Sequence, residues 1–151
     1  MAVVERLVVA GGLLVVAIVV ALVLQRRRPA APTQPRWEIP AQLDRADFDG
    51  AGACPWLVVV FTSTTCASCA EVVPKARALA SDDVAVVEVP YQQCKDLHDR
   101  YHVGVVPLTL VAGPDGVAKA SFVGTPTATD LWAAVAEARE PGSTPEPHLG
   151  S

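Results

Sequence analysis

The chain has 151 residues, of which 51% are hydrophobic, and a formal net charge of −4 at neutral pH. This length allows one domain with appendages. Residues 1–36 carry five arginines and one glutamate, whereas the rest of the chain carries 7 basic and 15 acidic side chains, a net charge of −8. An acidic main portion argues against nucleic-acid binding.

The first predicted element is an apolar segment at residues 7–24, which contains no charged or strongly polar side chain. As a helix it would rise about 27 Å, close to the hydrocarbon thickness of a bilayer. A cleaved signal peptide is the alternative. However, the segment is longer than the usual signal core, and arginines rather than small residues follow it directly. We therefore predict a transmembrane helix over residues 7–24, preceded by a short flank at residues 1–6.

The basic residues around this span predict its orientation. Arg26, Arg27, Arg28 and Arg36 follow it, against Arg6 and the α-amino group before it. Because arginine-rich flanks stay cytoplasmic, we expect the following domain to face the cytoplasm of a cell membrane, with an outward-facing domain as the alternative. Four prolines within residues 25–40 predict an extended linker. Residues 141–151 have the composition of a disordered tail.

Residues 41–140 predict one compact domain. A weak edge strand is expected near residues 36–39 and a helical turn over residues 43–48. Residues 56–62 form a continuous apolar and β-branched run, typical of a strand buried on both faces, and residues 84–89 are a second apolar strand. A helix is predicted over residues 66–80, with a kink at Pro74, and another over residues 93–101, with Leu97 and Tyr101 facing inward.

The second half of the domain predicts a hairpin and a helix. Strand 108–112 is followed by a Gly-Pro-Asp-Gly turn at residues 113–116 and an antiparallel return over residues 117–123. A final helix starts at Thr127 or Thr129 and runs to about Arg139. Its inward face is expected to comprise Leu131, Trp132, Val135 and Ala138. The order β-α-β-α-β-β-α predicts an α/β fold, with a mixed sheet of four to five strands and helices on both faces.

The chemistry of the chain concentrates in Cys66-Ala67-Ser68-Cys69, between a buried strand and a helix. Residues three apart share one helix face, so the two thiols can close a disulfide. Unpaired N–H groups and the positive end of the helix dipole favour a thiolate at the first cysteine, and the thiolate is the form that attacks disulfides. This pattern predicts a thiol–disulfide oxidoreductase in which Cys66 is the nucleophile and Cys69 the resolving thiol.

The element order and the placement of these cysteines resemble the thioredoxin family over residues 43–139. Pro74 stands eight residues after Cys66, like the proline that kinks the active-site helix of thioredoxins. Val106-Pro107 is placed like the family's cis-proline, and Gly124 like a glycine of its substrate groove. The resemblance implies a substrate groove that includes Thr65, Val106, Pro107 and Gly124. It also implies protein disulfides or dithiols as partners, with no cofactor or metal beyond the Cys66–Cys69 disulfide.

Several residues depart from the family pattern. Thr65 stands where thioredoxins usually have tryptophan, and Ala67-Ser68 where they have Gly-Pro. Val60 replaces the family's buried aspartate, and Glu88 stands where its lysine partner is found. Glu88 is either a proton relay, if it points inward, or a solvent-facing edge residue.

The remaining cysteines leave alternatives open. Cys94 is an auxiliary redox thiol or a half-buried small apolar residue. A structural zinc site would use Cys66, Cys69, Cys94 and His98, although a CxxC pair that opens a long helix is unusual for zinc. Cys54 is expected at the opposite end of its strand from Cys66, which argues against a Cys54–Cys94 disulfide. His98, His102 and His148 are expected to be solvated surface residues.

These patterns predict a membrane-tethered oxidoreductase that acts in the reducing direction, with a membrane redox partner as a further expectation. The alternatives are a redox-responsive binding module with little turnover, an outward-facing reductase of the kind that serves cytochrome maturation, and a disulfide-forming oxidant.

Overall fold

The computed structural model describes residues 37–143, and it divides the chain into two units, Met1–Arg36 and Trp37–Ser151. The predicted flank, the transmembrane helix at residues 7–24, most of the linker and most of the tail lie outside the described residues. Within residues 37–143, no helix has both the length and the apolar character that crossing a membrane requires.

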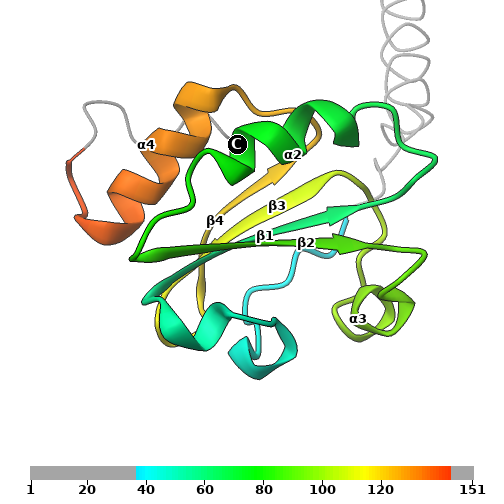
Figure 1. Ribbon diagram of the computed structural model, residues 1–151, viewed down its shortest axis with the longest axis horizontal. Coiled ribbons are helices and arrows are strands. Elements are labelled where there is room, and N and C mark those ends of the chain that lie inside the picture. The colour runs from blue at the N-terminus through cyan, green and yellow to red at the C-terminus, as the bar shows by residue number, and fades with distance from the viewer. Residues whose placement is uncertain (1–36, 144–151) are drawn as a thin grey trace, which may run out of the picture. The chain divides into compact units, whose positions relative to one another are not determined.

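A four-stranded mixed sheet forms the centre of the domain, with the strand order β2-β1-β3-β4 (Figure 1). The strands are β1 (Trp56–Thr62), β2 (Val84–Pro90), β3 (Leu108–Ala112) and β4 (Ala118–Val123). β1 pairs parallel with β2 and antiparallel with β3, and β3 pairs antiparallel with β4. β1 and β3 are the inner strands and are buried on both faces, which explains why their sequences are mainly apolar rather than alternating.

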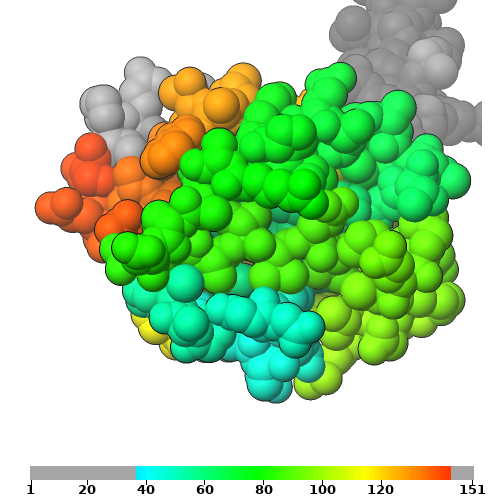
Figure 2. Space-filling view, in the orientation of Figure 1, coloured from blue at the N-terminus to red at the C-terminus, as the bar shows by residue number. Residues whose placement is uncertain are grey.

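Helices cover both faces of the sheet, as predicted. α2 (Cys69–Arg77) and α4 (Ala128–Arg139) lie side by side on one face, whereas α3 (Lys95–Arg100) and two short 3₁₀ helices, η1 (Arg45–Asp47) and η2 (Ala51–Ala53), lie on the other (Figure 1). Figure 2 shows α2 in green beside α4 in orange, with α3 and the N-terminal segments below them. The result is a three-layer α/β domain.

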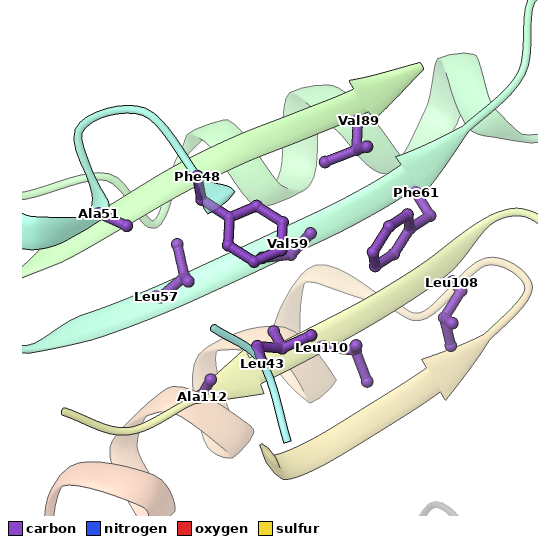
Figure 3. Close-up of a cluster of buried hydrophobic side chains, with 10 residues drawn as sticks. All are labelled: Leu43, Phe48, Ala51, Leu57, Val59, Phe61, Val89, Leu108, Leu110 and Ala112. Carbon is purple, nitrogen blue, oxygen red and sulfur yellow. The ribbon is translucent and has the colours of Figure 1, made fainter. Parts of the chain in front are cut away.

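The alternating side chains of the sheet build two cores. The core under α3 and the 3₁₀ helices contains Leu57, Val59 and Phe61 of β1 together with Leu108 and Leu110 of β3 (Figure 3). The core under α2 and α4 contains the other β1 face, Val58 and Val60, with side chains from both helices. Phe61 is fully buried, and burying a side chain of this size contributes about 1.5–3 kcal/mol. The inward positions of Leu97 and Tyr101 are confirmed, because both pack against the first core.

The helix boundaries differ from the predicted ones. α2 begins at Cys69 rather than Cys66. Residues Cys66, Ala67 and Ser68 form a turn in which each carbonyl accepts from the N–H three residues later, as the Cys66 carbonyl does from the Cys69 N–H at 3.2 Å. Pro74 lies inside α2, as expected. Thr127 is the N-cap of α4, and its hydroxyl and the Asp130 carboxylate form a capping box, which fixes the helix start.

Two predictions about elements are wrong. No strand forms at residues 37–39, and the N-terminal segment contributes only an isolated bridge between Gln42 and Val117. Pro40 has no N–H to donate, and η1 begins soon after the bridge, so a longer ladder cannot form. Trp132 is 55% exposed, whereas Leu131 and Val135 are buried. Successive helical residues differ in direction by about 100°, so Trp132 points away from the face that its neighbour buries.

Two sets of hydrogen bonds hold residues 42–48, the start of the domain, against its other elements. The Leu43 N–H donates to the Gly116 carbonyl at 2.8 Å. Gly116 has a φ of +75°, and a Cβ there would lie 2.1 Å from the Leu43 carbonyl oxygen, so this turn requires glycine. On the other side, the Tyr101 hydroxyl donates to Asp47 at 2.5 Å and accepts from the Asp44 N–H at 2.9 Å. These bonds join η1 to the end of α3.

Candidate active site

The two cysteines of the CxxC motif form a disulfide at the start of α2. Their Cα atoms lie 5.4 Å apart, within the usual range for a bridged pair. β1 ends at Thr62 and α2 begins at Cys69, so the intervening loop brings Cys66 to the carboxyl end of β1. Cys66 is half-buried and Cys69 is buried. An approaching disulfide can therefore reach Cys66 more easily than Cys69.

Polar groups surround the Cys66 sulfur. The Cys69 N–H points at Cys66 Sγ from 3.2 Å, and the Ser68 hydroxyl lies 3.4 Å from the same sulfur. The Cys69 N–H is shared between this sulfur and the Cys66 carbonyl, so a thiolate formed at Cys66 on reduction can accept from it and lies at the positive end of the α2 dipole. The site therefore stabilises negative charge on the more accessible sulfur, as an attacking thiol requires.

The predicted groove residues lie at the same end of the sheet as the disulfide. Phe61 pairs with Leu108, so Pro107 lies opposite the end of β1. The Val106–Pro107 peptide bond is cis, as the resemblance implied, and the Pro107 carbonyl accepts from the Gly124 N–H at 2.9 Å. Gly124 has a φ of +89°, a conformation that favours glycine, although a Cβ there would meet nothing within 4 Å. Thr65 is exposed and Val106 is half-buried.

Glu88 lies on the α2 side of the sheet, opposite Val60 in register. Its carboxylate accepts from the Thr62 hydroxyl at 3.1 Å and forms an ion pair with Arg77, in the last turn of α2, at 2.9 Å. The side chain is 30% exposed, which places it between the inward and the solvent-facing alternatives. A proton relay through Glu88 stays a prediction.

The two single cysteines lie near opposite ends of the β1–β2 pair. Cys54 precedes β1, whereas Cys94 follows β2 and stands directly before α3, without a side-chain capping hydrogen bond. Both are free thiols, so the structure contains no Cys54–Cys94 bridge, in agreement with the expected placement of Cys54. Cys94 is half-buried and packs against the core under α3, as the apolar alternative describes.

His98 is buried, which contradicts the prediction of a solvated side chain. It is 3% exposed, and its ring lies edge-on to Phe61 and Tyr91, at centroid distances of 5.1 and 5.3 Å. His98 Nε2 donates to the Val89 carbonyl at 2.9 Å, so this ring nitrogen has a hydrogen-bond partner although it is shielded from water. The inward direction follows from helix geometry, because His98 comes one turn after Cys94, which packs against the same core, and residues four apart share a helix face.

The zinc alternative finds no support in this geometry. Among residues 37–143, no three cysteine, histidine or acidic side chains gather as metal ligands would. Cys66 and Cys69 are bonded to each other, and the Nε2 atom of His98 is used by Val89. The four proposed ligands therefore do not form one tetrahedral set.

Sequence reasoning missed Gln92. This residue follows β2, and its side chain bonds to the loop between Thr62 and Cys66: Oε1 accepts from the Thr64 N–H at 3.1 Å, and Nε2 donates to Ser63 Oγ at 3.0 Å. The signal was available in part, because the carboxyl ends of parallel neighbouring strands meet at one edge of a sheet. Residues that follow the second strand were therefore candidates to contact the CxxC loop.

A buried mixed sheet with a CxxC disulfide at the head of a helix and a cis-proline beside it defines a thioredoxin-like protein. The family model named Thioredoxin matches residues 42–137, more than half of the chain. The chain therefore belongs to the thioredoxin family.

Solved structures agree on the fold. A mutant thioredoxin from Halobacterium salinarum is 20% identical, with a TM-score of 0.53 over 72% of this chain and 95% of that chain. The germline-specific thioredoxin Deadhead from Drosophila melanogaster is 24% identical, with a TM-score of 0.50 over 58% of this chain and 84% of that chain. At these identities the likeness concerns the fold alone. A comparison with curated proteins gives no match.

Proposed function

We propose that this protein is a membrane-tethered thiol–disulfide oxidoreductase that reduces disulfides of protein partners. The observation that carries the proposal is the placement of a half-buried Cys66 and a buried Cys69 at the head of α2, bonded to each other. This arrangement supplies a nucleophile with access to substrate and a second thiol that only its neighbour can reach.

The reaction has two exchange steps. The Cys66 thiolate attacks one sulfur of the substrate disulfide, which forms a mixed disulfide and releases the first substrate thiolate. The Cys69 thiolate then attacks the Cys66 sulfur, which closes the internal disulfide and releases the second substrate thiolate. Two electrons pass from the dithiol to the substrate, and an external dithiol must reduce the Cys66–Cys69 bond before the next cycle.

Each cysteine variant has a distinct expected result in an insulin-reduction assay with dithiothreitol as the electron donor. Cys66→Ser should abolish turnover. Cys69→Ser, reduced and then mixed with insulin after the dithiothreitol is removed, should trap the mixed disulfide as a covalent adduct on a non-reducing gel. Cys54→Ser is the matched control, because Cys54 lies at the other end of β1. Turnover that survives in Cys66→Ser would refute the proposal.

A redox-responsive binding module is the second candidate. Val60, at 1% exposure, occupies the place of the buried aspartate that the family uses beneath the active site, so no carboxylate stands there. If wild-type protein shows a normal redox titration of Cys66–Cys69 without turnover, this candidate is favoured.

The direction of the reaction and the side of the membrane need separate measurements. A midpoint potential near about −270 mV indicates a reductant, whereas one near about −120 mV indicates an oxidant. The arginine flank supports a domain on the cytoplasmic side. Labelling Cys54 in intact cells with a membrane-impermeant thiol reagent tests this placement, and labelling without lysis would favour the outward-facing alternative. Cys54→Ser supplies the background.

A further inference from the structure

The loop that carries Cys66 is fastened from a neighbouring strand end. Gln92 spans the gap with both ends of its amide, accepting from the Thr64 N–H at 3.1 Å and donating to Ser63 Oγ at 3.0 Å. We call Gln92, Ser63 and Thr64 the loop clamp. Neither of its bonds involves a sulfur atom, so reduction of the disulfide removes neither of them.

The backbone that holds Gln92 is itself fixed. The Tyr91 N–H donates to the Thr62 carbonyl at 2.8 Å, which extends the β1–β2 pairing beyond β2. The Pro90 carbonyl then accepts from the Gln93 and Cys94 N–H groups, at 3.0 and 2.9 Å. Because the turn is held on both sides of Gln92, an exposed side chain with several rotatable bonds is presented from a rigid base.

The clamped loop connects directly to the reactive sulfur. The Ser63 carbonyl accepts from the Cys66 N–H at 3.1 Å, and Ser63 Oγ lies 3.0 Å from the Thr65 hydroxyl. Ser63 therefore bonds to Gln92 on one side and to Thr65 and Cys66 on the other. Movement of Ser63 would shift Cys66 relative to the Cys69 N–H, which lies 3.2 Å from Cys66 Sγ.

We propose that Gln92 is a positioning residue for Cys66: the loop clamp holds the Cys66 sulfur where the Cys69 N–H and the positive end of the α2 dipole stabilise its thiolate. This inference rests on the proposed function for its consequence in catalysis, because it names a determinant of the same nucleophile. Thr65 stands at the residue before Cys66, and its short side chain cannot fasten the loop by packing as a large aromatic ring would, which leaves this task to hydrogen bonds.

The test compares Gln92→Ala with Gln93→Ala in the full-length chain, purified in mild detergent and reduced. Gln93 is a matched control, since it is the same residue type in the same turn, is exposed, and makes no side-chain hydrogen bond among residues 37–143. The readout is the rate of Cys66 alkylation by iodoacetamide as a function of pH, with the labelled peptide identified by mass spectrometry.

Loss of the clamp should slow alkylation at neutral pH by about three- to tenfold, the effect expected for one or two net hydrogen bonds, while the rate at alkaline pH stays unchanged. Insulin reduction should fall by a similar factor. Gln93→Ala should match the wild type in both assays. A purely structural role for Gln92 would lower thermal stability without moving the pH profile.

Gln92→Asn is a second variant, which keeps the test valid if Gln92→Ala does not fold. It keeps an amide suited to a turn, but it is one methylene shorter and cannot reach both Ser63 and Thr64. The same shift is expected. An alkylation profile identical to that of the wild type in folded Gln92→Ala or Gln92→Asn overturns the inference. Because alkylation does not require turnover, the proposed function can fail while the clamp is still tested.

Discussion

Replacement of Tyr101 by phenylalanine tests how α3, which follows the Gln92 turn, is fastened to the N-terminal segment. The Tyr101 hydroxyl donates to Asp47 at 2.5 Å and accepts from the Asp44 N–H at 2.9 Å. The ring stacks on Phe48 with centroids 5.8 Å apart, and phenylalanine would keep that contact. The substitution therefore removes two hydrogen bonds with little change in packing.

The expected loss follows from the charge on Asp47. A hydrogen bond to a charged group contributes about 1.5–3 kcal/mol, and the half-exposed position reduces this to about 1–2 kcal/mol. For a domain of about 100 residues, that loss lowers Tm by about 5–10 °C. Tyr91→Phe is the matched control, because Tyr91 is 40% exposed and its hydroxyl makes no hydrogen bond among residues 37–143.

The same substitution removes a pH-dependent contribution. Burial, and then the bond to Asp47, raise the pKa of Tyr101 from 10.0 to about 12. The native state therefore keeps a proton that the unfolded state loses above about pH 10, so this stabilisation is complete below that pH and disappears as the pH rises through about 12. After allowance for screening at a half-exposed site, we expect about 1 kcal/mol.

Urea unfolding followed by tryptophan fluorescence at about pH 8 and about pH 11 measures both effects. Wild type and Tyr91→Phe should lose more stability than Tyr101→Phe over this interval. The reasoning is refuted if Tyr101→Phe is as stable as Tyr91→Phe at the lower pH and all three proteins change equally with pH.

Three further substitutions test other parts of the structure. Thr127→Ala removes the N-cap of α4 and should lower Tm by about 4–8 °C at neutral pH. The Thr127 hydroxyl and N–H lower the pKa of Asp130, so this loss should shrink as acid protonates Asp130; an equal loss at about pH 2 and about pH 7 would contradict the capping box. If Glu88 relays a proton, Glu88→Gln should slow the second exchange step at least about tenfold. An unchanged rate would refute the relay and would mean that Glu88 has only a structural role, through its bonds to Arg77 and Thr62. His98→Ala should cost about 2–4 kcal/mol in urea unfolding, through a cavity beside Phe61 and the unpaired Val89 carbonyl, and exposed His102→Ala should cost far less.

Sequence patterns were sufficient wherever a local rule decided the outcome. The apolar runs at residues 56–62 and 84–89 predicted β1 and β2, and the Gly-Pro-Asp-Gly turn predicted the hairpin between β3 and β4. Thr127 predicted the start of α4 through its capping chemistry. The spacing of Cys66 and Cys69 predicted their disulfide, since residues three apart at a helix start lie within bonding reach.

Tertiary packing decided the features that depend on distant neighbours. His98 is buried although histidine was expected at the surface, and Trp132 is exposed although tryptophan was expected in the core. The orientation of each helix on the sheet, and not the polarity of the residue, selects which side chain is buried. The edge strand shrank to the Gln42–Val117 bridge because Pro40 and η1 limit the pairing on either side.

The sequence by itself determined the chemistry of this protein, because the two thiols and the helix that polarises them are neighbours along the chain. Only the tertiary structure decided what holds that chemistry in place. Ser63 and Gln92 are separated by 29 positions, and their contact exists because β1 and β2 lie parallel and end at the same edge of the sheet.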